Sequence, residues 1–230
     1  MPRQNALVRL RSVKKHVLEE KLGIKKHVFV QIFNKTAWFM SHRIRYAMQQ
    51  PQFRGRLKGI IEVDETYVGG KPRRTQKGAI KCRGTKKTPV VALVQRSGFV
   101  KSQVMTRLTG KNLKEFVYEN VDNTAVVMTD EFKSYKMLRK NYQHKTIRHD
   151  LREYVRGQVH TNTVEGYFSL LKRGITGVFH HVSKKHLHRY LSEFDFRYNM
   201  RKQNDGVLAV RLLNGVEVKR LLYRDSSSVA

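Results

Sequence analysis

The feature that most constrains the fold of this chain is a change of hydrophobic period near residue 59. Residues 59–68 alternate apolar and polar side chains, which is the pattern of a strand. Two more apolar runs follow at 90–94 and 100–105, with a hairpin-like turn between them. The sequence therefore predicts three strands in succession at the start of a sheet domain.

The order of the later elements narrows the fold further. Residues 112–121 and 132–139 have helical spacing, 125–128 form a short apolar run, and 144–149 suit a polar strand before a long helical C-terminal half. Three strands, a helix, a strand, a helix, a strand and more helices is the order of the ribonuclease H-like fold. We predict an α/β domain with a mixed five-stranded sheet and helices on both faces.

The first 50 residues are basic and helical in pattern. Asn34 is predicted to cap one helix, after a turn near Gly23. Two short basic helices suit a helix-turn-helix that contacts DNA through Arg43 and Arg45, and they equally suit plain helical packing. We expect a helix-turn-helix-like region at residues 1–50 and a ribonuclease H-like domain at residues 57–205. A C-terminal extension with a disordered end should follow at residues 206–230.

Charge narrows the choice of partner. The chain has 47 Lys and Arg against 18 Asp and Glu, a formal net charge of +29. Because the basic residues are spread along the whole chain, the folded surface itself should be positive, and nucleic acid is the commonest partner of such a surface. Ribosomal and DNA-packaging proteins share this composition, so charge alone does not separate an enzyme from a passive binder.

Cysteine use and hydropathy indicate the compartment. Cys82 is the only cysteine, which excludes an internal disulfide and argues against a thiolate zinc site. The sequence has no run near the roughly 20 apolar residues of a membrane span, and its first residues lack the apolar core of a signal peptide. We expect a cytoplasmic protein that acts on the nucleoid and does not enter a membrane.

A strongly basic segment separates the first two predicted strands. Residues 71–88 hold eight basic side chains and no acidic one. A solvated loop is the plain interpretation. A segment of this charge beside acidic residues is better suited to holding phosphates. We therefore predict a mobile arm that contacts DNA, with Lys71, Arg73 and Arg74 among its contacts.

Three carboxylates are candidates to meet in the predicted fold. Asp64 is read as the end of the first strand, and Asp130 directly follows the fourth. If these strands are neighbours, both carboxylates emerge together. Glu165 lies on a predicted helix that also carries Lys172 seven positions later, about 20° away around the axis. The helix therefore turns an acid and a cation towards one surface.

Such a trio suits metal-dependent phosphoryl chemistry. Carboxylate oxygens are the ligands that Mg²⁺ prefers, and two ions about 3.5–4 Å apart activate the attacking oxygen and stabilise the leaving oxygen at phosphorus. Each acid also has a plain alternative. Asp64 can cap a turn, Asp130 can cap the next helix, and Glu165 can pair with Lys172 or Arg173.

The segments around these acids resemble bacterial insertion-sequence transposases of the DDE class, in the Merlin-related, ISXO2-like group. Residues 61–71 resemble the group's first catalytic motif, and 129–131 with Tyr135 resemble the second. The third corresponds to residues 160–165, continuing to 174. Residues 184–187 and 193–199 resemble the helical tail of the same group. The likeness covers about residues 34–200.

The resemblance implies a ribonuclease H-like core that uses Asp64, Asp130 and Glu165 with two Mg²⁺ or Mn²⁺ ions. It implies a dimer or higher oligomer that binds terminal inverted repeats, cleaves phosphodiesters at the ends of the element and joins the freed 3′-hydroxyls to target DNA. Expected DNA contacts are Lys172, Arg173, His160, Asn162, Lys71, Arg73, Arg74, Arg43 and Arg45.

Two departures from the group and two rival functions stay open. Many members begin with a cysteine-rich zinc ribbon, which residues 1–33 do not resemble. Some relatives carry Asn in place of the third acid, so Asn162 is a lesser candidate for that role.

One rival function is that of a metal-dependent nuclease that does not transfer strands. The other is a non-catalytic DNA-binding protein derived from a transposase.

Overall fold

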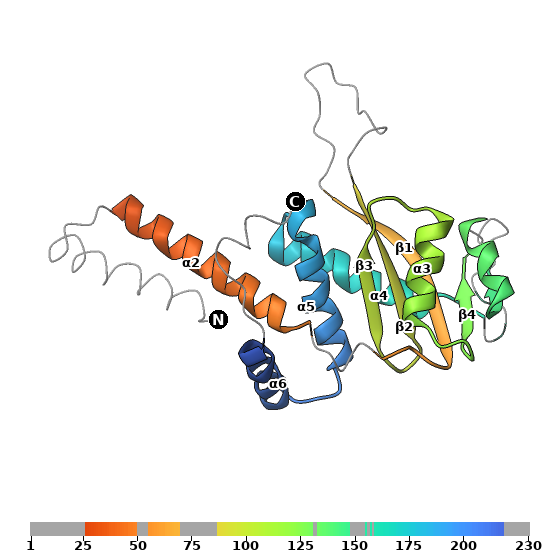
Figure 1. Cartoon of the computed structure of the whole chain (residues 1–230). Coiled ribbons are helices and arrows are strands. Elements are labelled where there is room, and N and C mark those ends of the chain that lie inside the picture. The colour runs from red at the N-terminus through yellow and green to blue at the C-terminus, as the bar shows by residue number, and fades with distance from the viewer. Residues whose placement is uncertain are drawn as a thin grey trace, which may run out of the picture.

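A computed structural model describes residues 26–49, 55–69, 87–130, 133–147, 155, 157 and 159–218. Figure 1 shows a twisted sheet with helices on both faces and a long N-terminal helix that extends away from it. The predicted basic arm at 71–88 and the C-terminal end lie almost entirely outside the described residues. None of the described helices combines the length and apolar character needed to cross a membrane.

The sheet has five strands in the order β3-β2-β1-β4-β5. β1 (Ile60–Val68) pairs antiparallel with β2 (Thr88–Gln95), which pairs antiparallel with β3 (Val100–Val104). On its other side β1 pairs parallel with β4 (Val126–Thr129), which pairs parallel with β5 (Gln143–Thr146). This mixed sheet and its flanking helices confirm the predicted ribonuclease H-like fold.

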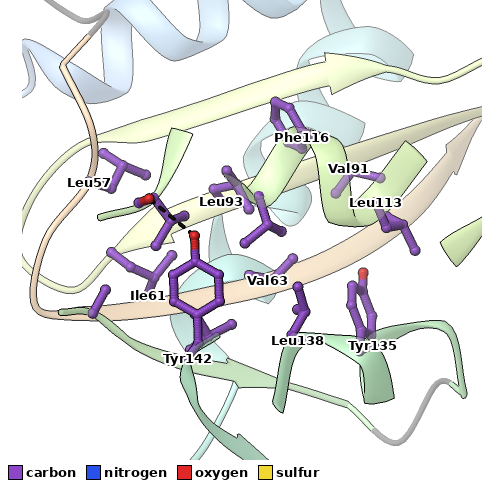
Figure 2. Close-up of a cluster of buried hydrophobic side chains, with 14 of the residues drawn as sticks. Leu57, Ile61, Val63, Val91, Leu93, Leu113, Phe116, Tyr135, Leu138 and Tyr142 are labelled. Carbon is purple, nitrogen blue, oxygen red and sulfur yellow. Dashed lines mark hydrogen bonds between the residues drawn. The ribbon is translucent and has the colours of Figure 1, made fainter. Parts of the chain in front are cut away.

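One face of the sheet packs against α3 (Gly110–Asn120), as Figure 2 shows. Ile61 and Val63 of β1 enter this core. The Tyr142 hydroxyl donates a hydrogen bond of 3.2 Å to the carbonyl of Val121 at the edge of the cluster. α3 contributes its buried apolar stripe, Leu113, Phe116 and Val117.

The opposite face packs against α4 (Asn162–Gly174) and α5 (Leu187–Asn199). α4 buries the predicted apolar stripe, Val164, Phe168 and Leu171, and continues as the π-helix η4 (Ile175–Phe179). A short 3₁₀ helix, η5 (Lys184–His186), leads into α5. Because side chains alternate across a strand and Val63 faces α3, Glu62 and Asp64 of β1 face α4.

α5 also covers the outer edge of the sheet at β3. The Ser102 N–H donates to Asp195 Oδ2 at 2.9 Å, and the Val100 N–H donates to Asn199 Oδ1 at 2.7 Å. The Tyr167 hydroxyl of α4 donates to Asp195 Oδ1 at 2.5 Å. Unpaired strand edges are prone to pair with other chains, so these side chains protect the edge and fix α5 on the sheet.

The N-terminal helix does not begin at Asn34, where sequence analysis predicted a helix cap. α2 runs from Lys26 to Ala47 without a break, so Asn34 lies inside the helix and does not cap it. No glycine or proline interrupts this segment, and the modest cost of one interior asparagine does not stop a helix. The turn predicted near Gly23 and the helix before it lie outside the described residues.

Arg45 has a structural role that sequence analysis did not predict. Its Nε donates to Glu193 Oε2 at 2.8 Å, and its guanidinium carbon lies 4.1 Å from the centroid of the Tyr190 ring. Arg45 is buried and fixes α2 on α5, and its DNA contact stays a prediction. α2 also contacts α6 (Asp205–Val218). Arg43 is half-buried, and its DNA contact stays a prediction.

Two of the later predicted elements differ in detail. The segment predicted as a helix at 132–139 is a 3₁₀ helix, η2 (Lys133–Lys140), packed against α3. The polar strand predicted at 144–149 is β5, which begins at Gln143 and ends at Thr146. Its short pairing with β4 ends where β4 itself ends, at Thr129.

Gly174 allows α4 and α5 to approach closely. A Cβ atom at this position would overlap the ring of Phe194. We expect Gly174→Ala to lower the free energy of unfolding by about 1–2 kcal/mol, because the displaced ring costs more than alanine gains in helix propensity. Urea denaturation measures the change.

Gly166 provides the matched control in the same helix. Among the described residues, no atom beyond its chain neighbours and the backbone of its own helix lies within 4 Å of the corresponding Cβ position, so Gly166→Ala is expected to raise the free energy of unfolding by about 0.5–1 kcal/mol. If the Gly174→Ala variant were stabilised to the same extent, the close contact with Phe194 would be wrong.

Candidate active site

Asp64 lies within β1, where the neighbouring strand β4 ends. The pairing of β1 with β4 stops at Val63 and Thr129, whereas its pairing with β2 continues to Val68. The prediction that Asp64 ends its own strand is therefore wrong. The Glu65 N–H donates a hydrogen bond of 2.7 Å to Asp64 Oδ1 and helps to fix the carboxylate.

Asp130 directly follows β4, beside Asp64. The two strands are parallel, and Val63 is in register with Thr129, so Asp64 and Asp130 are the next residues along neighbouring strands. Such strands lie about 4.8 Å apart. The prediction that the first and fourth strands are neighbours is confirmed.

Glu165 comes from α4, which packs against β1. It lies in the first turn of the helix and is exposed, and the Thr161 hydroxyl donates to its Oε1 at 3.2 Å. The helix therefore places a third carboxylate on the α4 side of the sheet. That is also the side that Asp64 faces.

Burial and neighbouring acids make Asp64 harder to ionise than an exposed aspartate. Burial raises the pKa of Asp64 to about 7 against the effect of the Glu65 N–H hydrogen bond, and the charges of Glu65, Asp130 and Glu165 also raise it. The ionised form of Asp64 is therefore disfavoured in the folded protein without a bound cation. A cation at this position would relieve the repulsion.

Glu65 is a fourth acid at this position that sequence analysis did not single out. Its Oε2 accepts a 2.6 Å hydrogen bond from the hydroxyl of Tyr135, which is fully buried. Burial raises the pKa of Glu65, and the charge of Asp130 adds to the rise. Glu65 therefore adds to the negative charge beside Asp64 while Tyr135 holds its side chain.

The carboxylates of Asp64, Asp130 and Glu165 are suitable ligands for a divalent cation, although their side chains are not gathered around one point. Among the described residues, no three His, Cys, Asp or Glu side chains are gathered tightly enough to hold a metal ion. Oxygen donors from separate elements are nevertheless the ligands that Mg²⁺ and Mn²⁺ take. Their mutual repulsion at Asp64 is what such an ion would neutralise. Metal binding by the trio stays a prediction.

Glu62 is a fully buried carboxylate at the start of α4, and sequence analysis also passed over it. Its oxygens accept hydrogen bonds from the Thr163 N–H at 2.7 Å, the Thr163 hydroxyl at 2.9 Å and the Val164 N–H at 3.1 Å. Arg96 Nε donates to it at 2.6 Å, and His160 Nδ1 lies 3.3 Å away. The signal that the sequence carries for it is an acid directly flanked by the apolar Ile61 and Val63.

The predicted DNA contacts fall into three groups. Lys172 and Arg173 are exposed on the last turn of α4, and Asn162 is exposed at its start. His160 is half-buried with its Nδ1 towards Glu62, so part of its ring faces inward. Outside the described residues lie three candidates from the arm, Lys71, Arg73 and Arg74.

Known proteins with similar sequences or structures are connected with transposable elements. An uncharacterized protein in transposable element ISH50 of Halobacterium salinarum is 28% identical over 182 residues, which cover 73% of this chain and 61% of that protein. The chain thus spans less than two thirds of this relative.

Two solved structures of Mos1 are more distant. A pre-cleavage Mos1 transpososome has 12% identity and a TM-score of 0.29, covering 90% of this chain and 75% of the other. A Mos1 transposase paired-end complex with the left transposon end has 11% identity and a TM-score of 0.30, covering 88% and 74%.

A family model gives a more specific match. The ISXO2-like transposase domain matches residues 56–199, a range that contains the sheet and Asp64, Asp130 and Glu165. The resemblance drawn from the sequence motifs is therefore confirmed. Because this match covers more than half of the 230 residues, the chain belongs to the ISXO2-like transposase family.

Proposed function

We propose that this protein is a DNA transposase that cleaves phosphodiesters at the ends of an insertion sequence and transfers the 3′-hydroxyl strands to target DNA. The observation that carries the proposal is the placement of Asp64 and Asp130 on neighbouring parallel strands, with Glu165 on the helix α4 that packs against β1, in a chain of net charge +29. An acidic site on a cationic protein needs cations to approach a phosphodiester, and this need matches metal-dependent phosphoryl transfer.

The three acids would hold two Mg²⁺ or Mn²⁺ ions, with Glu165 as the exposed member of the set. When bound, such ions supply activation of the attacking oxygen and stabilisation of the leaving oxygen. Asp64 and Asp130 are fixed by the paired strands that carry them, and Glu165 is fixed by α4. The chain therefore supplies the positions from which the acids orient their ligands.

DNA would lie along the exposed side of α4. Lys172 is seven residues beyond Glu165, about 10 Å along the helix on the same side. Lys172 and Arg173 therefore provide positive charge for phosphates near the acidic end of the helix. The basic arm and the N-terminal helices would add contacts, with the protein acting on two transposon ends as a dimer or higher oligomer.

An assay with purified full-length protein tests this function. Duplexes carrying candidate terminal repeats should be cleaved with Mg²⁺ or Mn²⁺ and stay intact with EDTA, and pre-cut ends should be joined to a target plasmid. Cleavage without joining would show a nuclease that does not transfer strands. DNA binding without cleavage in either metal would show a non-catalytic binding protein and reject the proposal.

A further inference from the structure

We propose that Glu62 and Arg96 form a buried clamp that positions the first turn of α4, and with it Glu165, against β1 and β4. They are positioning residues, because they act through the acids and helix that they hold. The consequence for DNA cleavage rests on the function proposed above. The effect on α4 does not, and it is measured separately below.

The Glu62 carboxylate takes the place of an ordinary helix cap. The first N–H groups of a helix have no partner inside it. Among the described residues, Thr161 at the N-cap position makes no capping side-chain hydrogen bond, and Glu62 accepts the N–H groups of Thr163 and Val164 instead. A negative charge is also favourable at a helix N-terminus. Glu62 therefore ties the start of α4, immediately before Glu165, to β1.

Arg96 connects the clamp to β4 as well as to β1 and the start of α4. It directly follows β2, and its Nε donates to Glu62 at 2.6 Å. Its Nη2 donates to the carbonyl of His160, just before α4, at 3.0 Å, and lies 3.2 Å from the sulfur of Met128 on β4. The planar guanidinium fork presents several donors in fixed directions. One side chain thus contacts all three segments that carry the acids.

The contacts lie close in sequence to the acids that they would position. Glu62 precedes Asp64 by two residues, and Met128 precedes Asp130 by two. Thr163 precedes Glu165 by two. A fully buried carboxylate is costly unless it is paired and hydrogen-bonded, and Glu62 is paired with Arg96 and accepts hydrogen bonds from the first turn of α4. The clamp therefore fixes the relative positions of the three segments that carry the acids.

The variant Glu62→Gln tests the clamp. Glutamine keeps the size of the side chain but loses the charge and one acceptor oxygen. We expect the single-turnover rate of Mg²⁺-dependent cleavage to fall about 100-fold, because small displacements of reacting groups have effects of this size. The dissociation constant for DNA should not change. Amide hydrogen exchange should become faster in residues 160–166, with protection in β2 unchanged.

Two further variants separate positioning from general stability. Arg96→Lys keeps a cation for Glu62 but has no fork to contact three segments, so the cleavage rate should fall about tenfold. Glu193→Gln breaks another buried carboxylate–guanidinium pair, between α5 and α2, which carry none of the three acids. It should lower the thermal midpoint but leave the cleavage rate unchanged at temperatures well below that midpoint.

Three results would overturn the clamp. They are a Glu62→Gln cleavage rate within threefold of wild type, unchanged exchange in residues 160–166, or an equal rate loss in Glu193→Gln. If Glu62→Gln does not fold, the rate and exchange of Arg96→Lys decide in the same way. Hydrogen exchange needs neither metal nor DNA, so a wild-type protein that fails to cleave would reject the proposed function while the clamp is still tested.

Discussion

Asp64→Asn is expected to lower the rate of Mg²⁺-dependent cleavage of transposon-end DNA by at least about a thousandfold, which corresponds to ~4 kcal/mol. The amide has no charge to neutralise the metal and offers one oxygen where the carboxylate offers two. Asp130→Asn and Glu165→Gln should have effects of the same order. Single-turnover cleavage with excess protein measures the chemical step apart from product release.

The stability of the same variant should change in the opposite direction. Asp64 is held beside Glu65, Asp130 and Glu165, and burial and their charges disfavour its ionised form. Removing its charge should therefore raise the free energy of unfolding of the metal-free protein at pH 8 by about 1–2 kcal/mol. Inactivity together with higher stability would exclude unfolding as the cause of the loss, which is the usual ambiguity of such variants.

The DNA affinity of Asp64→Asn and a control variant of an acid far from the site complete the test. The affinity for DNA should stay the same or rise, because a negative charge near phosphates is removed. Glu115→Gln removes an exposed carboxylate from α3, on the other face of the sheet, and should leave cleavage unchanged. An Asp64→Asn variant that cleaves within tenfold of the wild-type rate would show that Asp64 does not hold the metal.

The sheet and the placement of Asp64 and Asp130 could be predicted because they depend on local patterns. Alternation along β1 and the short apolar run of β4 are visible in the sequence, and the order of elements then makes the two strands neighbours. The alternation over 59–68 also predicted the full length of β1, and only the position of Asp64 was wrong, because β4, and not β1, ends beside it.

The roles of Glu62 and Arg45 could not be predicted because their partners are far away in the chain. Glu62 contacts Thr163, 101 residues later, and Arg45 contacts Glu193, 148 residues later. From sequence alone, a basic residue on an amphipathic helix is placed at the surface. Burial of Arg45 required an acid from α5 with the right geometry, and no spacing rule reports such a pair.

The second large expected effect concerns acid pH and His42 of α2. His42 is fully buried, with its ring centroid 4.2 Å from that of Trp38 and 4.8 Å from that of His186. Neither ring nitrogen has a hydrogen-bond partner among the described residues. Burial lowers the pKa of His42 to about 3, and His186 of η5, Arg189 and His188 of α5, and Arg45 of its own helix lower it further.

The direction of the effect follows from proton uptake. Below the unfolded pKa of about 6.5 the unfolded chain binds a proton at His42 that the folded chain does not. The stability from this residue is present above pH 6.5 and is lost as pH falls towards 3. Asp64 and Asp195 act in the opposite direction, because burial raises their folded pKa to about 7 and the folded chain takes up their protons first.

Because these contributions offset one another in the wild type, the contribution of His42 is measured as the difference in free energy of unfolding between a variant and the wild type. His42→Phe keeps an aromatic ring and removes the titrating group, so its free energy of unfolding relative to wild type should rise by about 2.5 kcal/mol between pH 7.5 and 4.5. Trp38→Phe, beside it, has no titrating group and should give a difference that is constant with pH. Urea denaturation at the two pH values measures both, and a constant difference for His42→Phe would mean that His42 is protonated in the folded protein.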